Sequence, residues 1–275
     1  MSANKSANES ANKRAGTLSS DFDGLVAVVT GAAQGIGRGI ATALHARGAR
    51  VLLLDRNANG LTAVAESLRG RGGPSVNSIV VDLADAAAIA ALTEQVAALE
   101  SKVDVLVNNA GIEYDLPFEE ITTELFDRVI AVNQRAPFLL TRALAPLFPT
   151  SGGAIVNISS IHADHAFPNA IPYACSKAAL VALTRNLALE LAPRRIRVNA
   201  ICPGYIESPM LDEWLQLSPD PEALLRQVQE LHPLGRVGTP CDVAAAVAFL
   251  AGPSAAWITG TVLVVDGGLT IRAHP

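Results

Sequence analysis

Tyr173 and Lys177 stand four residues apart in the segment Tyr-Ala-Cys-Ser-Lys, which opens a helical pattern. This spacing places both side chains on one face of a helix. A free tyrosine has a pKa of about 10 and is a poor base at neutral pH, but a neighbouring ammonium group favours the phenolate and lowers that pKa. The pair therefore predicts a general acid/base. A surface contact between two helical residues is the alternative interpretation.

Ser160 and Asn133 extend this pair to a candidate catalytic set of four. Ser160 lies thirteen residues before Tyr173, where a strand is expected to end, and its hydroxyl can orient a substrate oxygen. Ser159 competes for this role, but adjacent hydroxyls on a strand point in opposite directions and the spacing favours Ser160. Asn133 falls inside a predicted helix, where asparagine is a poor helix former. A buried amide there can bind a water that relays protons from Lys177, although a turn serine and a satisfied polar core residue are the alternatives.

A glycine-rich segment follows the first predicted strand and opens the first predicted helix. Gly31, Gly35 and Gly37 allow a tight turn and the close approach of backbone to a pyrophosphate. Gln34 and Ile36 lie in the same segment, whose amide groups are expected to face the phosphates. An ordinary glycine-rich turn is the alternative, but the position in the chain favours dinucleotide binding.

Acidic residues end or follow the next two predicted strands. A carboxylate at Asp55 accepts hydrogen bonds from ribose hydroxyls and repels a 2′-phosphate, which favours NAD over NADP. Arg56 argues for NADP, because a guanidinium can bind that phosphate. Asp82 and Leu83 are expected to meet the adenine. For both aspartates, capping of the next helix is the alternative interpretation.

The fourth predicted strand runs into Asn108, Asn109, Ala110 and Gly111. Small residues at this point let backbone approach the cofactor, and the Asn109 side chain can join neighbouring strand ends. A simple strand-to-loop turn is the alternative, since this composition also suits one.

Short apolar runs alternate along the chain with Ala/Leu-rich segments of helical periodicity. The predicted strands are residues 25–30, 50–55, 77–81, 103–108, 154–159, 196–201 and 261–265, and the predicted helices are residues 35–47, 61–69, 86–99, 123–148, 172–191 and 241–251. Strands that are apolar on both faces are typical of parallel sheets covered by helices. We therefore predict an α/β fold, a single-domain Rossmann-type doubly wound parallel sheet of about seven strands. The candidate residues then share its carboxyl edge, where such sheets bind ligands.

Two segments depart from this rhythm. Residues 1–20 contain a four-residue repeat of the type Ser-Ala-Asn-Lys and are expected to form a disordered tail. Residues 21–275 are then one dinucleotide-binding domain, and the proline-rich stretch at about 205–238 is expected to be a lid over the substrate.

Composition narrows the class of protein. Of the 275 residues 50% are hydrophobic, which suits a large core, and the net charge of −5 without clustered Lys or Arg excludes a nucleic-acid surface. No apolar run approaches the roughly 20 residues that span a bilayer. Three scattered cysteines predict neither a disulfide framework nor a zinc site and favour a cytoplasmic location. His162 and His165 lack further ligands nearby, so no metal is expected.

The order and spacing of these motifs resemble the short-chain dehydrogenase/reductase family from about residue 25 to residue 269. The resemblance rests on Thr30-Gly31-x-x-x-Gly35-x-Gly37, Asn108-Asn109-Ala110-Gly111, Asn133, Ser160, Tyr173-x-x-x-Lys177 and Pro203-Gly204. It implies that Tyr173 is the general acid/base and that Lys177 binds the nicotinamide ribose and lowers the Tyr173 pKa. It also implies that Ser160 polarises the substrate oxygen and Asn133 completes the proton relay.

The resemblance further implies that Pro203, Gly204 and Ile206 border the nicotinamide. Ser208 stands where the family often has Thr, and its hydroxyl can make the same hydrogen bond to the carboxamide.

Together these features predict an NAD(H)-dependent oxidoreductase that transfers hydride between a nicotinamide and a secondary alcohol or ketone. A sugar or polyol is favoured from the habit of the family and from the polar, His-containing loop after Ser160. An NADP(H)-dependent ketoreductase is one alternative, supported by Arg56. A catalytically inactive, dinucleotide-sensing regulator is the other, disfavoured because Tyr173 and Lys177 are both present. A homo-oligomer, with a tetramer favoured, is expected from the same resemblance.

Overall fold

A seven-stranded parallel sheet forms the centre of the computed structural model, which describes residues 21–272. The strands follow the order β3-β2-β1-β4-β5-β6-β7, and each neighbouring pair is parallel. They are β1 (Val26–Thr30), β2 (Arg50–Asp55), β3 (Val76–Val80), β4 (Val105–Asn108), β5 (Gly153–Ile158), β6 (Ile196–Pro203) and β7 (Val262–Val265). The repeat at residues 1–20, predicted to be a disordered tail, lies outside the described residues.

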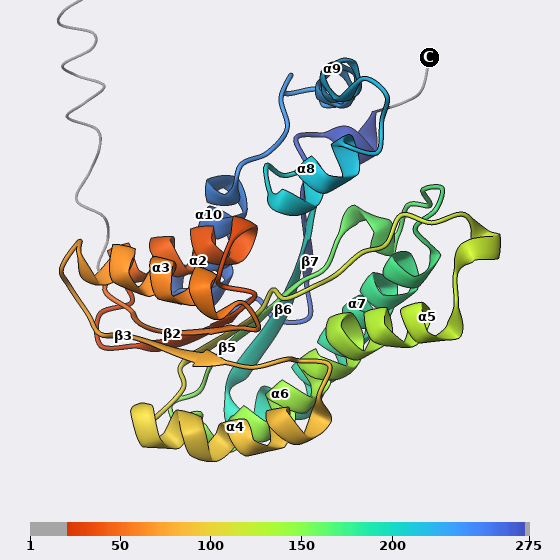
Figure 1. Cartoon of the computed structure of the whole chain (residues 1–275). Coiled ribbons are helices and arrows are strands. Elements are labelled where there is room, and N and C mark those ends of the chain that lie inside the picture. Colours follow the sequence, from red (N-terminus) through yellow and green to blue (C-terminus); the bar gives the residue numbers. More distant parts are fainter. Residues whose placement is uncertain (1–20, 273–275) are drawn as a thin grey trace, which may run out of the picture.

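Helices cover both faces of the sheet (Figure 1). One face carries α2 (Gly35–Ala46), α3 (Ala58–Arg69) and α10 (Pro240–Ala251), and the other carries α4 (Ala86–Leu99), α5 (Thr123–Ile130), α6 (Ala136–Leu144) and α7 (Ile171–Leu191). The predicted doubly wound α/β fold is therefore confirmed. Within residues 21–272, no helix combines the length and the apolar character needed to cross a membrane.

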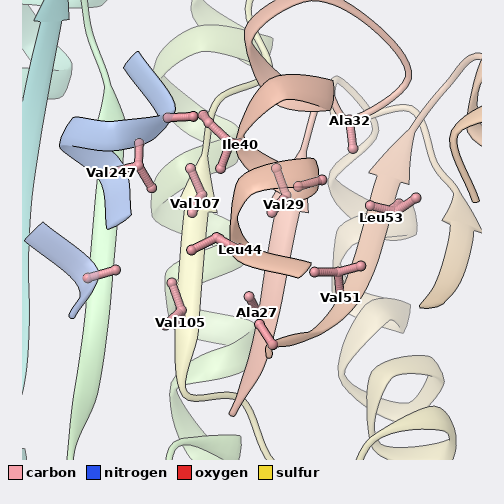
Figure 2. Close-up of a cluster of buried hydrophobic side chains, with 14 of the residues drawn as sticks. Ala27, Val29, Ala32, Ile40, Leu44, Val51, Leu53, Val105, Val107 and Val247 are labelled. Carbon is pink, nitrogen blue, oxygen red and sulfur yellow. The ribbon is translucent and has the colours of Figure 1, made fainter. Parts of the chain in front are cut away.

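The alternation of side chains along each strand divides the core into two layers. Figure 2 shows the layer beneath α2, where Val29 of β1 and Val107 of β4 pack against Ile40 and Leu44 of the helix. Val28, one residue away from Val29 on β1, belongs to the opposite layer under α4 and α6. A strand that is apolar at every position therefore supplies side chains to both layers of the core. This explains why the strands are continuous apolar runs in the sequence.

The predicted helix at residues 123–148 is wrong as a single element. It is divided into α5, a π-helical turn at Ala131–Arg135, α6 and a 3₁₀ turn at Ala145–Leu147. Pro137 at the start of α6 has no amide hydrogen to donate, so the regular ladder cannot continue through it. The π-helical turn places Asn133, which is fully buried, at the break.

The segment predicted as a lid contains two helices, α8 (Pro209–Leu215) and α9 (Pro221–Leu231). They lie beyond one end of the sheet (Figure 1). They share a small apolar cluster of Leu211, Leu215, Val228 and Val237 that is separate from the two main layers. The segment thus has a core of its own above the carboxyl edge.

A chain of buried hydrogen bonds joins β4, β5 and α7. Asn108 Nδ2 donates to Asn157 Oδ1 at 2.8 Å, and Asn157 Nδ2 donates to Thr184 Oγ1 at 2.8 Å. Asn157 and Thr184 are completely buried. Removal of the central amide leaves the Asn108 donor without its partner in a place that water does not reach, which is costly.

We predict that Asn157→Ala lowers the free energy of unfolding by about 2–3 kcal/mol, because it leaves a buried polar group unsatisfied and opens a small cavity. Denaturant unfolding measures the change. Asn186→Ala is the matched control: Asn186 is exposed on α7, and its side chain bonds only Ala182 O. A loss as small for Asn157→Ala as for the control would contradict the role of the buried chain.

Candidate active site

A large cavity, of about 690 Å³, opens at the carboxyl ends of the strands. Nearly all the residues singled out from the sequence line it: Gly31, Gln34, Gly35, Ile36, Gly37, Asp55, Asp82, Leu83, Asn109, Ala110, Gly111, Ser160, Tyr173, Lys177, Pro203, Gly204, Ile206 and Ser208. Asn108 and Asn133 do not line it, because both are buried, Asn133 behind the wall of the cavity. The topology therefore brings together residues that come from seven separate parts of the chain.

Lys177 ties α7 to the end of β5. Its Nζ donates to Ile158 O at 2.8 Å, and the Ser159 hydroxyl donates to Lys177 O at 2.9 Å. The same contact sets Tyr173 beside the ammonium, with Nζ 5.4 Å from the centre of the phenol ring. The Ser159 hydroxyl is bonded to Lys177 O and so does not contact the phenol of Tyr173. The hydroxyl that hydrogen-bonds with Tyr173 and acts to lower its pKa is that of Ser160.

Asn133 holds the segment that follows β4. Its Oδ1 accepts from Ile112 N at 2.9 Å, and its Nδ2 donates to Ile112 O at 2.8 Å and to Ser176 Oγ at 3.1 Å. The side chain therefore couples the wall of the cavity at Ile112 to α7 at Ser176. The proton relay through Asn133 stays a prediction.

Burial shifts the pKa values of Tyr173 and Lys177. Burial raises the pKa of Tyr173, the nearby Glu113 carboxylate raises it further, and the Ser160 hydroxyl acts in the opposite direction. Burial also lowers the pKa of Lys177 to about 8, with Glu113 opposing it. The predicted lowering of the Tyr173 pKa is wrong, because the cost of forming a phenolate away from water outweighs the hydrogen bond from Ser160 that favours it.

The glycine loop has no room for side chains. A Cβ added at Gly37 would lie 2.1 Å from Gly31 O, and Gly31 itself has φ +64°. Asn109 fixes this loop, since its Nδ2 donates to Thr30 O at 2.9 Å and to Gly31 O at 3.3 Å. A cradle of bare backbone at a helix start fits a pyrophosphate.

The two aspartates beside this loop have different partners. Asp55 accepts from Ala33 N at 3.1 Å and from Asn57 N at 2.9 Å, so one carboxylate orders both the glycine loop and the start of α3. Asp82 forms an ion pair with Arg128 at 2.9 Å. Burial acts to raise the Asp82 pKa, but hydrogen bonds from Ala84 N and Arg128 outweigh it, and the pKa is lowered. No sequence pattern pointed to Arg128, which lies on α5, 46 residues from Asp82 along the chain.

Glu113 and Asp115 were not predicted, although they line the cavity. Glu113 Oε1 lies 3.8 Å from His162 Nδ1, and Asp115 Oδ2 accepts from Trp214 Nε1 at 2.8 Å. Burial raises the pKa of Glu113 to about 7, Asp115 adds to the effect and Lys177 opposes it. Burial and the charge of Lys177 lower the pKa of His162 to about 4. The position of Glu113, two residues after Gly111, was the available signal for it.

Metal chemistry has no support in this part of the chain. Across residues 21–272, no group of three or more His, Cys, Asp or Glu side chains is arranged to hold an ion. His165 is exposed, and His162 packs against aromatic rings instead.

Known proteins are similar to this chain in sequence and in fold. A family model described as Enoyl-(Acyl carrier protein) reductase matches residues 31–270. D-threitol dehydrogenase of Mycolicibacterium smegmatis is 39% identical over 260 residues, which cover 93% of this chain and 98% of that protein.

Two solved structures extend the comparison. Thermoplasma acidophilum aldohexose dehydrogenase in ligand-free form superposes with a TM-score of 0.83 at 35% identity, covering 93% of this chain and 98% of that one. A blue fluorescent protein from a metagenomic library, solved in complex with NADPH, superposes with a TM-score of 0.82 at 36% identity, covering 90% and 99%.

We predict that Glu113 makes the stability of the protein depend on pH. A carboxyl whose pKa rises from 4.5 to about 7 on folding stabilises the protein below its unfolded pKa, and this contribution is lost as the pH rises through about 7. Glu113→Gln cannot ionise, so its melting temperature should exceed that of the wild type more at about pH 8 than at about pH 5.

The control for this comparison is Glu222→Gln, which makes the same change at a side chain that is 91% exposed. Its effect on the melting temperature should be small at both pH values. A Glu113→Gln protein that is less stable than the wild type at about pH 8 would show that Lys177 more than offsets the burial of the carboxylate.

Proposed function

Because this chain belongs to the short-chain dehydrogenase/reductase family, we propose that it transfers hydride between NAD(H) and a secondary alcohol or ketone, with a sugar or polyol as the favoured substrate class. One observation carries the proposal: the Tyr173–Lys177 pair, Ser160 and the glycine loop face one cavity. D-threitol and aldohexose dehydrogenases among the relatives support the substrate class.

A nicotinamide dinucleotide, when bound, accepts or supplies the hydride. The backbone at Gly31, Gly35 and Gly37 would hold its pyrophosphate. The remaining contacts would be Asp55 to the adenosine ribose, Asp82 and Leu83 to the adenine, Lys177 to the nicotinamide ribose, and Pro203, Gly204, Ile206 and Ser208 around the nicotinamide. Ser208 Oγ accepts from Leu211 N at 3.3 Å, which leaves its proton free to donate to a carboxamide.

Tyr173 handles the proton in this scheme. In the direction of reduction its phenol donates to the oxygen that develops negative charge, and in the direction of oxidation its phenolate removes the hydroxyl proton. The raised pKa of Tyr173 keeps the phenol protonated and ready to donate. The Lys177 ammonium, held by Ile158 O, stabilises the phenolate when it forms, and Ser160 orients the reacting oxygen.

The segment at 205–238 would cover the substrate. Met210, Leu211 and Trp214 of α8 line the cavity, and the hydrogen bond from Trp214 to Asp115 joins α8 to the segment after β4. Closure of such a segment excludes water from the reaction. The cytoplasmic location and the homo-oligomeric assembly stay predictions from the sequence.

Tyr173→Phe tests the mechanism. The change removes one oxygen atom, so we expect the turnover of alcohol with NAD to fall by at least about a thousandfold while the affinity for NADH changes little. Absorbance of the reduced nicotinamide measures turnover, and fluorescence titration measures binding. Substantial activity in the Phe variant would refute Tyr173 as the acid/base.

Asp55→Ala tests the choice of cofactor. Loss of the carboxylate removes the acceptor for ribose hydroxyls and the repulsion of a 2′-phosphate, so kcat/KM with NAD should fall by about tenfold or more relative to kcat/KM with NADP. The neighbouring Arg56 would then favour NADP. The comparison of the two cofactors matters because the blue fluorescent protein, which is similar to this chain, was solved in complex with NADPH. A wild-type protein that prefers NADP would contradict the assignment of NAD.

A further inference from the structure

The substrate end of the cavity is built around Glu113 and His162. Glu113 lies two residues past Gly111, after β4, and His162 lies two residues past Ser160, in the short turn Ile161–Ala163 after β5. Both side chains line the cavity next to Tyr173. Neither has a part in the proton transfer described above.

The His162 ring and the backbone before Glu113 are held in place by their neighbours. The His162 ring stacks on Phe167 with centroids 4.2 Å apart and meets Tyr173 edge-on at 5.2 Å. Its backbone amide donates to Ser160 Oγ at 3.2 Å. Glu113 follows Ile112, whose backbone is bonded twice by the Asn133 side chain. The His162 ring and the backbone that leads into Glu113 are therefore fixed relative to the Tyr173 phenol.

The gap between Glu113 and His162 has room for one hydroxyl group. The 3.8 Å between Glu113 Oε1 and His162 Nδ1 is too long for a hydrogen bond. His162 Nδ1 is buried and has no hydrogen-bond partner among the described residues. A hydroxyl oxygen can lie at hydrogen-bond distance from both atoms, donating to the carboxylate and accepting from the ring nitrogen.

The charges around this gap oppose an anionic substrate. Asp115 adds a second carboxylate close to Glu113. Of the described residues that line the cavity, the two arginines are at the adenosine end, where Arg128 is paired with Asp82 and Arg56 follows Asp55. A substrate carboxylate beside Glu113 would thus lack a guanidinium partner and face two like charges. Lys177, the other cation among the described lining residues, already donates to Ile158 O, so the site carries no free cation for an acid, which is an effective way to reject a ligand.

We propose that Glu113 and His162 are specificity-determining residues that bind a second hydroxyl of the substrate close to the reacting carbon, so that uncharged polyhydroxy compounds are selected over simple alcohols and hydroxy acids. The proposal rests on the proposed function and deepens it. It assigns the choice of substrate to a pair of side chains outside the catalytic set.

Three four-carbon secondary alcohols separate the possibilities: D-threitol, 2-butanol and 3-hydroxybutyrate. For the wild type, kcat/KM should be at least about a hundredfold higher for D-threitol than for the other two, since a site built to bind a hydroxyl rejects analogues without it. Glu113→Gln should lower kcat/KM for D-threitol by about tenfold or more, mainly through KM, and leave 2-butanol within about twofold. At about pH 8, where a carboxyl with a pKa of about 7 is ionised, it should raise kcat/KM for 3-hydroxybutyrate, because one of the two negative charges is removed.

His162→Phe keeps the stacking on Phe167 and removes the ring nitrogen, so it should reproduce the loss for D-threitol alone. Glu222→Gln, the matched change on the exposed face of α9, should leave all three substrates unchanged. Equal losses for D-threitol and 2-butanol in Glu113→Gln would assign this residue to the catalytic machinery and overturn the proposal. A wild type that prefers 3-hydroxybutyrate would overturn it as well.

A binding measurement separates this proposal from the proposed reaction. D-threitol and xylitol are titrated calorimetrically into Tyr173→Phe and into the double variant with Glu113→Gln, each saturated with NAD. Affinity at least about tenfold weaker in the double variant supports the recognition pair even if the wild type oxidises no alcohol, an outcome that would refute only the reaction. Equal affinity of the two variants, or no binding to either, would overturn the proposed role of Glu113 and His162 in substrate recognition. This holds whether or not the wild type turns over an alcohol.

Discussion

The site depends on one buried contact, in which the Lys177 ammonium donates to the carbonyl of Ile158 at the end of β5. The Ser159 hydroxyl closes the same contact from the strand side by donating to Lys177 O. Ser160 follows Ser159 in the chain, and Tyr173 lies one helical turn before Lys177. These two hydrogen bonds therefore fix the position of Ser160 relative to Tyr173. A buried ammonium needs such partners, because an unpaired charge away from water is strongly unfavourable. The geometry of acid, base and substrate oxygen therefore follows from the docking of α7 on the sheet.

The same burial sets the charges of the whole cavity. It raises the pKa values of Tyr173 and Glu113 and lowers those of Lys177 and His162, which in each case favours the neutral form. Burying these ionisable side chains lowers the free energy of unfolding. Such a loss is common in sites whose chemistry requires side chains with shifted pKa values. The fully satisfied amides around it, Asn133 behind the wall and Asn157 between strands, hold the costly groups in place.

The cavity has two halves with different constructions. The cofactor half consists mainly of backbone, with glycines that admit no Cβ and an asparagine that locks two strand ends together. The substrate half consists of side chains from the loops after β4 and β5 and from α8, including Glu113, His162 and Trp214. A family can keep the first half constant and change its substrates through the second, because loop side chains vary without disturbing the sheet. The similarity of this chain to a D-threitol dehydrogenase, an aldohexose dehydrogenase and a blue fluorescent protein fits a constant cofactor half and a variable substrate half.

Local patterns in the sequence were enough to predict the sheet, the glycine loop and the Tyr173–Lys177 pair, since periodicity and short spacings act within one or two elements. The break near Asn133 in the long helix was missed, because tertiary hydrogen bonds to Ile112 and Ser176 hold that residue in a π-helical turn. Contacts such as Trp214 with Asp115, 99 residues apart, depend on how the loops fold over the sheet edge. The direction in which the Tyr173 pKa shifts could be found only from the structure. The spacing of the sequence reveals a neighbouring charge, but only the packing reveals how completely water is excluded from the phenol.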